Sequence, residues 1–343
     1  MTPPLRLGTR GSALALAQAR MVASMLDADV VLVPITTSGD EHSTTLRKGS
    51  DPVTGSPTRN APVTGSDPPP AGEKGGGSDP HPSPLSRTPA DKSRFVKEIE
   101  EALLREDVDL AVHSAKDVPG ELPDGLAIVG VPERADARDA LCGAAALDDL
   151  PEGARVGTSS LRRRAQLLAL RPDLRVSDLR GNVDTRLRRL ADGDYHAIVL
   201  AMAGLERLDR AREGSPIPPA DFVPAPGQGC LALEARVDDE RSIELGAAVT
   251  DRAALQALTA ERALVVTLEA TCRTPVAAHA ERSEAGLRLT AFAGLPDGSR
   301  WIRDGLSIDA GHPSELGTGV ADRLLAAGAA ELLAEAETAA PSR

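Results

Sequence analysis

Aromatic side chains are scarce in this sequence, with three Phe, one Tyr and one Trp among 343 residues. Proteins that bind single-stranded nucleic acid stack the bases on such rings. The formal net charge of -12 also opposes binding to a polyanion, which depends on clustered positive charge. We therefore expect no nucleic-acid partner.

Cysteine and histidine are few as well, and neither is spaced as in a metal site. The cysteines, Cys142, Cys230 and Cys272, form no CxxC pair, and the histidines form no HxH or HxxxH pair. Zinc sites use such spacings, and a disulfide framework needs an even set of cysteines. We predict no metal and consider each cysteine singly.

No apolar run approaches the ~18 residues that a membrane-crossing helix needs. The N-terminal segment also lacks the basic start and unbroken apolar core of a secretory signal. We expect a soluble, cytoplasmic protein with no membrane partner. Its 343 residues suffice for two or three domains.

What the sequence has in abundance is arginine, concentrated in residues 156–190. This basic stretch holds nine Arg, no Lys and three Asp in a chain that is acidic overall. A guanidinium presents a rigid fork of donors that matches a carboxylate or phosphate with two hydrogen bonds. The basic stretch therefore predicts a binding site for an anion. Its arginines are Arg162, Arg163, Arg164, Arg171, Arg175, Arg180, Arg186, Arg188 and Arg189.

Two segments predict a strand, a tight turn and a helix in succession. The first turn, residues 8–12, precedes an Ala/Leu-rich helix, and the second, residues 157–160, precedes a helix over residues 161–170. Ser12 is placed to cap the first of these helices. Because the start of a helix offers unpaired N–H groups and the positive end of its dipole, both turns are suited to bind an anion.

Buried-type strands alternate with helices through residues 1–247, which predicts an α/β fold. Lys116 and Asp117 directly follow the strand over residues 108–113, at the strand end where open α/β sheets bind ligands. The alternative for this dipeptide is an ordinary surface ion pair.

Residues 43–91 interrupt this pattern with a stretch rich in Gly, Pro, Ser and Thr, in which GSDP occurs three times. Such a composition buries too little apolar surface to offset chain entropy, so we predict a disordered insertion. From residue 251 onward, a helix, a hairpin around residues 296–298 and a closing helix over residues 320–337 predict an α+β domain.

Seven motifs occur in one order along the chain: LGTRGSALALAQA, AVHSAKDVP, VGTSSLRRRAQL, LRGNVDTRL, AIVLAMAGLERL, PAPGQG and AERALVVTLEATCRTPV. With them the chain resembles the porphobilinogen deaminases, also called hydroxymethylbilane synthases, over nearly everything except the insertion. The resemblance implies two α/β domains of the type II periplasmic-binding-protein kind around a cleft, plus a smaller α+β C-terminal domain. These domains would be residues 1–133 with 225–247, residues 134–224, and residues 251–343.

The resemblance also implies an activity. Members of the family are transferases that condense four porphobilinogens head to tail and release ammonia, giving hydroxymethylbilane for tetrapyrrole and haem synthesis. Their cofactor is a dipyrromethane held through a thioether to a cysteine, which by its place in the motif is Cys272 here. Porphobilinogen carries acetate and propionate groups, so the anion for the basic stretch would be a carboxylate. We expect the protein to act as a monomer.

By resemblance, Asp117 is the catalytic carboxylate, which bonds pyrrole nitrogens and stabilises the positive charge that builds on the attacking ring. Lys116 supports it. The remaining arginines of the basic stretch are expected to lie mostly on solvated helix faces. The groups implied to hold carboxylates of cofactor and substrate are Arg10, Ser12, Lys92, Ser160, Arg162, Arg163, Arg180, Arg186 and Arg207.

The chain departs from the family pattern in two places. Ala270 and Thr271 stand where the family usually has Gly-Gly, and a β-branched Thr resists a backbone of positive φ. The insertion replaces a shorter mobile loop, and a lid role for it is open. Two other functions also remain open, namely a non-catalytic carboxylate-binding protein of the periplasmic-receptor type and RNA binding through the basic stretch.

Overall fold

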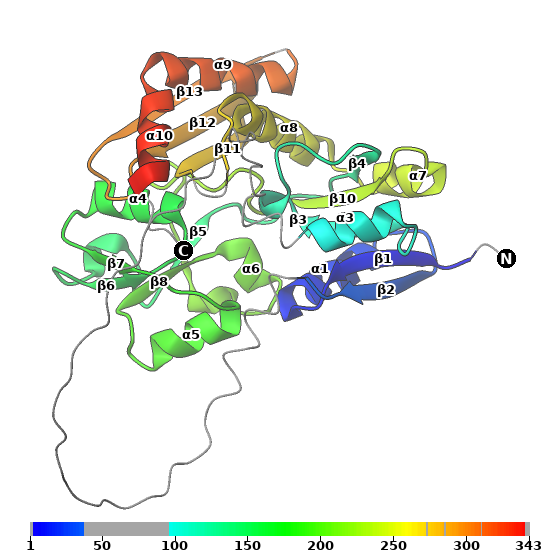
Figure 1. Cartoon of the computed structure of the whole chain (residues 1–343). Helices are drawn as coiled ribbons and strands as arrows, with labels where there is room; N and C mark the ends of the chain where they lie inside the picture. Colours follow the sequence, from blue (N-terminus) through cyan, green and yellow to red (C-terminus); the bar gives the residue numbers. More distant parts are fainter. Residues whose placement is uncertain (1–2, 38–95, 272–273, 285, 310, 340–343) are drawn as a thin grey trace, which may run out of the picture.

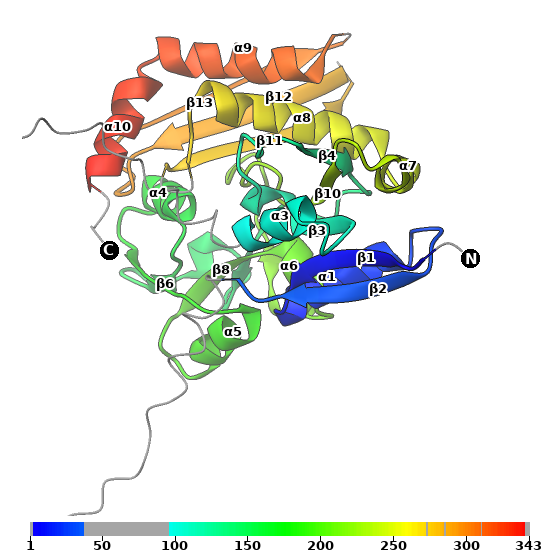
Figure 2. The ribbon, with the colours of Figure 1, turned by 45° about the vertical axis from the view of Figure 1, so that its right-hand side comes forward.

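The computed structural model describes residues 3–37, 96–271, 274–284, 286–309 and 311–339. They form three β-sheets, two of five strands and one of three (Figure 1). Figures 1 and 2 show the three-stranded sheet and its helices lying above both five-stranded sheets. The predicted disorder of residues 43–91 concerns a segment outside the described residues.

The first sheet has the strand order β2-β1-β3-β10-β4. β1 pairs in parallel with β2 and β3, whereas β10 runs antiparallel between β3 and β4. Because side chains alternate along a strand, Val112 of β3 packs towards α1 and Ala111 packs towards α3 on the other face. The elements are β1 (Leu5–Arg10), α1 (Ala13–Ala23), β2 (Val30–Ile35), α3 (Lys97–Leu104), β3 (Leu110–Ser114), β4 (Leu126–Gly130), β10 (Leu231–Arg236) and α7 (Glu240–Ala248).

The second sheet has the order β7-β6-β8-β5-β9. β6 pairs in parallel with β7 and β8, and β5 runs antiparallel between β8 and β9. The elements are β5 (Asp139–Cys142), β6 (Arg155–Gly157), α4 (Leu161–Leu170), β7 (Arg175–Ser177), α5 (Val183–Ala191), β8 (Ala197–Ala201), α6 (Met202–Glu206) and β9 (Ser215–Pro216).

The two five-stranded sheets share one plan. In each, three parallel strands in the order second, first, third are followed by an antiparallel strand and an outer strand. The antiparallel strand begins just after the chain has crossed between the sheets, at Asp139 for β5 and at Leu231 for β10. This is the type II periplasmic-binding-protein-like α/β arrangement, and it confirms the predicted fold class.

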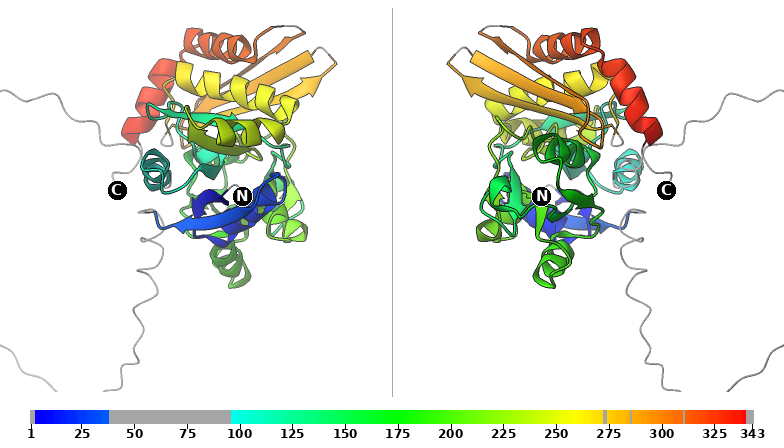
Figure 3. Two further views of the ribbon diagram at one scale, coloured as in Figure 1. Left: turned by 90° about the vertical axis from the view of Figure 1, so that its right-hand side faces the viewer. Right: turned by 90° about the vertical axis from the view of Figure 1, so that its left-hand side faces the viewer.

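The third sheet has the order β11-β12-β13 and carries its helices on one face, where they enclose an apolar core (Figure 3). The predicted hairpin is confirmed, since β12 and β13 pair antiparallel on either side of the turn at residues 296–298. The prediction of a single closing helix over residues 320–337 was wrong. The chain turns at Gly328, whose φ is 96°, and forms two helices. The elements are α8 (Arg252–Thr267), β11 (Val276–Ser283), β12 (Gly286–Gly294), β13 (Trp301–Ile308), α9 (Pro313–Ala326) and α10 (Ala329–Ala339).

A buried ion pair ties the third sheet to the crossing segments. Arg134, on the outward crossing, donates from Nη1 to Oε1 of Glu261 on α8 at 2.7 Å. The backbone N–H of Gly227, on the return crossing, donates to the same carboxylate at 2.6 Å, and that of Ala280 on β11 donates at 2.7 Å. The Glu261 side chain is fully buried. One carboxylate therefore holds both crossings and β11 together.

Candidate active site

Lys116 and Asp117 lie in a short 3-10 turn, Ala115–Asp117, at the carboxyl end of β3. β3 is the middle strand of the first sheet, and both side chains are half-buried. Lys116 Nζ lies 3.4 Å from Oε1 of Gln228, to which it donates. Gln228 in turn donates from Nε2 to the backbone carbonyl of Ala137 at 2.8 Å. The turn is thus joined to both crossings between the two five-stranded sheets.

Two helices begin beside the sheets in the way the sequence predicts. Ser12 caps α1, its Oγ accepting from the N–H of Ala15 at 3.2 Å. Ser160 caps α4, its Oγ accepting from the N–H of Arg163 at 3.4 Å. Each cap satisfies one N–H of the first turn and leaves the others for a ligand or water. Arg10, half-buried, ends β1 two residues before the first cap.

Arg162 and Arg163 share one buried carboxylate, that of Asp139 at the start of β5. Arg162 donates to it from Nη1 at 2.7 Å and from Nη2 at 3.1 Å. Arg163 donates from Nε at 2.8 Å and contacts it from Nη2 at 2.7 Å. Burial alone raises the pKa of Asp139, but the two guanidinium charges and their hydrogen bonds outweigh it and hold that pKa below the ordinary value.

The two arginines also bond to backbone carbonyls, Arg162 to Val223 and Arg163 to Val199. A guanidinium has five N–H groups. Arg162 makes three hydrogen bonds to the protein, and Arg163 makes two and one further Nη2 contact with Asp139, so each keeps at least two N–H groups. Burial lowers the pKa of Arg163, with the Asp139 charge opposing. The pair is therefore anchored inside the second sheet and retains donors for a further acceptor.

Arg186, on α5, has no acidic partner among the described residues. Its Nε donates to the carbonyl of Gly181 at 2.8 Å. Burial lowers its pKa to about 10, and the charge of Arg163 adds to the effect. A desolvated guanidinium beside another cation is a favourable place for an incoming carboxylate.

Arg207 follows α6 and is held in a similar way. Its Nη2 donates to the carbonyl of Gly229 at 2.7 Å, and its buried Nε has no hydrogen-bond partner in the described part of the chain. Burial lowers its pKa. Arg180 differs from both, since it is exposed and its Nη2 lies 3.8 Å from Oδ2 of Asp178.

The other arginines of the basic stretch are mostly engaged at the surface. Arg164 donates to the Val176 carbonyl, and Arg188 is exposed. Arg175 lies on β7, an edge strand, and not on a helix. Arg171 pairs with Asp173 and Arg189 with Asp194. The arginines therefore divide into an inner group and a peripheral one.

Three residues that matter here were not singled out from the sequence: Asp139, Gln228 and Glu261. Asp139 stands 23 residues before Arg162, and Glu261 stands 127 residues after Arg134, so no local pattern links them. One signal was present, because an acidic residue inside an apolar strand needs a buried cation. Asp139 opens the strand DALC, and Glu261 lies on the buried face of α8.

The segment before the predicted attachment cysteine avoids the strain that the sequence suggested. The left-handed backbone falls on Glu269, with φ of 48°, and neither Ala270 nor Thr271 has a positive φ. The N–H of Thr271 donates to Oγ1 of Thr274 at 2.8 Å, and that hydroxyl donates to the Thr271 carbonyl at 2.7 Å. Cys272 and Lys92 themselves lie outside the described residues.

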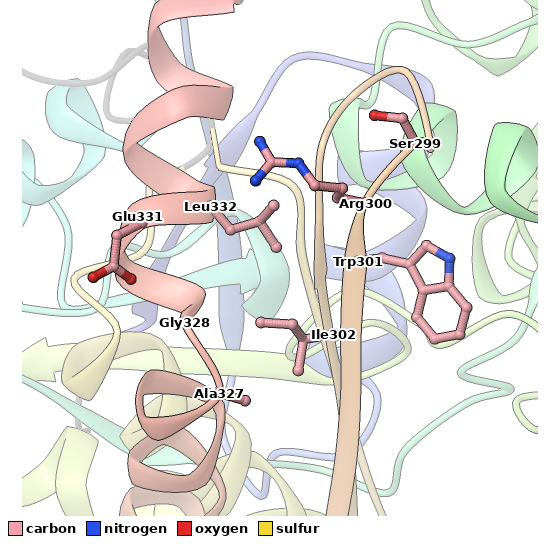
Figure 4. Close-up of a pocket in the computed structure, with 8 residues that line it drawn as sticks. All are labelled: Ser299, Arg300, Trp301, Ile302, Ala327, Gly328, Glu331 and Leu332. Atoms are coloured by element: carbon pink, nitrogen blue, oxygen red, sulfur yellow. The ribbon is translucent and has the colours of Figure 1, made fainter.

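A surface hollow of about 590 Å³ lies elsewhere, between the start of β13 and the α9–α10 junction (Figure 4). Trp301 and Ile302 line it on one side and Leu332 on the other. Its one cation, Arg300, already pairs with Glu335. The hollow offers no free charge for a carboxylate, so we place the candidate site at the crossings.

The remaining cysteines and the metal prediction can be compared with the described residues. Cys142 and Cys230 are fully buried free thiols, and burial raises the pKa of each to about 12. They are inert core residues. Among the described residues, no group of three or more His, Cys, Asp or Glu is arranged to hold a metal ion. None of the described helices combines the length and apolar character that spanning a membrane requires.

Comparison with known proteins gives one consistent result. A family model described as "Porphobilinogen deaminase, dipyromethane cofactor binding domain" matches residues 5–52 and 77–244, and one described as "Porphobilinogen deaminase, C-terminal domain" matches residues 255–326. The porphobilinogen deaminase of Deinococcus radiodurans is 42% identical over 336 residues, covering 95% of this chain and 97% of that protein. That of Thermus thermophilus is 44% identical over 338 residues, covering 96% and 98%. The chain belongs to the porphobilinogen deaminase family.

Proposed function

We propose that this chain condenses four porphobilinogens head to tail on a covalently attached dipyrromethane, releasing ammonia and then hydroxymethylbilane for tetrapyrrole synthesis. As a member of the family it is a transferase, and dipyrromethane is its cofactor. The observation that carries the residue roles is the half-buried Lys116–Asp117 turn, joined through Gln228 to both crossings.

The cationic groups fit a ligand that carries several carboxylates. Arg186 and Arg207 are half-buried and form no ion pair among the described residues, and burial lowers the pKa of each, a cost that a bound carboxylate offsets. We assign both, with Arg10, Arg180 and the helix starts capped by Ser12 and Ser160, to carboxylates of cofactor and substrate. Arg162 and Arg163 take the same role with their two remaining donors each. Lys92 is assigned by its motif position alone.

The cofactor, when attached at Cys272, supplies the pyrrole carbon to which the first substrate ring is joined. Asp117 accepts hydrogen bonds from the ring N–H of the reacting pyrrole. Its carboxylate stabilises the positive charge that grows on that ring in the transition state and assists removal of the proton from the ring. Lys116, held by Gln228, supplies a cation in the same turn as Asp117.

We further propose that the protein acts as a monomer in the cytoplasm, with porphobilinogen as substrate and with no metal, membrane or nucleic-acid partner. The acidic net charge and the shortage of aromatic side chains support the last point. The three sheets support domain boundaries at residues 1–133 with 225–247, 134–224 and 251–343.

Intact-mass measurement of the purified protein tests the cofactor. We expect the wild type to carry the added mass of two linked pyrrole rings, Cys272→Ser to lack it, and the control Cys142→Ser to keep it. An unmodified wild type would contradict the proposal. If that protein still bound porphobilinogen without releasing ammonia, it would instead be a non-catalytic carboxylate-binding protein.

The role of Asp117 is tested in the loaded enzyme by following hydroxymethylbilane formation. Asp117→Ala is expected to fold and to lose nearly all turnover, because the charge on the reacting ring loses its counter-charge. Asp124→Ala, which removes an exposed carboxylate seven residues away, is the matched control. Normal turnover in Asp117→Ala would remove the catalytic assignment.

A further inference from the structure

The turn that carries Asp117 packs against α8, the first helix of the third domain. Ala115 and Val118, on either side of Lys116 and Asp117, pack in one buried apolar cluster with Ala254 and Leu258 of α8. The N–H of Ala115 also donates to the carbonyl of Cys230 at 3.1 Å, so the return crossing and α8 both hold the turn.

A polar contact fixes the far end of the same segment. Arg262, one turn after Leu258 on α8, donates from Nη2 to the backbone carbonyl of Gly120 at 2.8 Å. A Cβ placed on Gly120 would lie 3.3 Å from Cγ2 of Val266, so the backbone there runs close against the helix. The hydrogen bond links residues 142 positions apart in the sequence. Residues 115–120 are thus held at both ends by α8.

A buried pair lies inside the first sheet, next to the turn. Nε2 of His113 lies 2.9 Å from Oε2 of Glu234, and both side chains are almost fully buried. Burial lowers the pKa of Arg262, and the charge of Glu234 opposes that shift. His113 immediately precedes Ser114 at the end of β3.

We propose that Arg262 is a positioning residue for the condensation: from the third domain, it fixes the segment 115–120 that presents Asp117 to the substrate. This inference rests on the proposed function, in which Asp117 stabilises the transition state. Displacing a catalytic group by ~1 Å lowers the rate of the chemical step on the order of 100-fold. Arg262 does not touch the carboxylates of porphobilinogen in this account, so substrate affinity is unaffected.

The test uses the loaded enzyme and the variant Arg262→Gln, with Arg252→Gln as matched control. Arg252 is an exposed arginine at the start of the same helix. We expect kcat of Arg262→Gln to fall about 10- to 100-fold while KM for porphobilinogen changes less than about threefold. Arg252→Gln should change neither. Arg262→Lys, which keeps the charge and a donor, should recover part of kcat.

A second measurement reports on position directly. Hydrogen exchange followed by mass spectrometry should show faster exchange over residues 114–122 in Arg262→Gln, with the strands of the first sheet unchanged. If Arg262→Gln does not fold, kcat and hydrogen exchange are measured on Arg262→Lys instead. Both should then change in the same direction by a smaller amount. Unchanged kcat with unchanged exchange overturns the inference, and so does a rise in KM at constant kcat. A wild type that carries no dipyrromethane refutes the proposed function instead, while the exchange experiment still tests the contact.

Discussion

We expect the stability of the second sheet to depend strongly on the carboxylate of Asp139. It is fully buried and receives four contacts between 2.7 and 3.1 Å from Arg162 and Arg163. The substitution Asp139→Asn removes the negative charge. It also places the side-chain NH₂ group of Asn, a hydrogen-bond donor, against the N–H donors of the two guanidinium groups. Two guanidinium groups then remain buried without a counter-charge, and leaving one such group unpaired costs about 3–5 kcal/mol.

We therefore expect Asp139→Asn to lower the free energy of unfolding by at least about 3 kcal/mol, measured by urea denaturation at pH 7. The control is Asp194→Asn, which breaks the exposed pair with Arg189 and should cost less than about 1 kcal/mol. A loss below ~1 kcal/mol in Asp139→Asn would refute the reasoning, because it would mean that the two charges are compensated without Asp139.

Two further predictions concern buried groups away from the site. Burial, followed by the charge of Glu234, raises the pKa of Glu100 to about 7, so the folded state binds the proton more tightly than the unfolded chain. Stability should then fall as pH rises from about 4.5 to 7, and Glu100→Gln should flatten that part of the profile in thermal melts at a series of pH values; an unchanged slope would contradict this. A Cβ on Gly317 of α9 would lie 2.2 Å from the backbone carbonyl oxygen of Ala260 on α8, so Gly317→Ala should push the helices apart and cost about 1–3 kcal/mol in urea denaturation. Gly319→Ala, where the nearest atom is a flexible Leu306 methyl at 3.5 Å, is its control, and equal effects of the two would argue against the close approach.

The sequence predicted correctly those features, such as strands and helix caps, that depend on residues close together in the chain. The strand predicted over residues 108–113 and the Ser12 cap depend on neighbours within a few positions, and the structure has both. The closing helix was misjudged because an Ala/Leu-rich segment gives strong helical periodicity, whereas one residue, Gly328, decides where it turns.

The inner arginines show where sequence reasoning ends. Arg162 and Arg163 were expected, by resemblance, to hold carboxylates of cofactor and substrate. The carboxylate that the structure places against them is that of Asp139, a residue of their own chain. The charge and shape of a guanidinium determine that its partner is a carboxylate or phosphate, but only the fold determines which carboxylate lies against it. Binding of a substrate carboxylate to the remaining N–H groups of Arg162 and Arg163 stays a prediction.

The position of β10 in the sequence affects how the first sheet folds during synthesis. During synthesis β1, β2 and β3 can pair early, but β4 joins the sheet only through β10, which begins only at Leu231. The ribosome must therefore complete the whole second sheet before the first one can close. At a synthesis rate of about 5–20 residues per second, a half-built sheet with open edges persists for several seconds at least. The edge of β3 stays unpaired during that interval, and an unpaired strand edge is a template for aggregation.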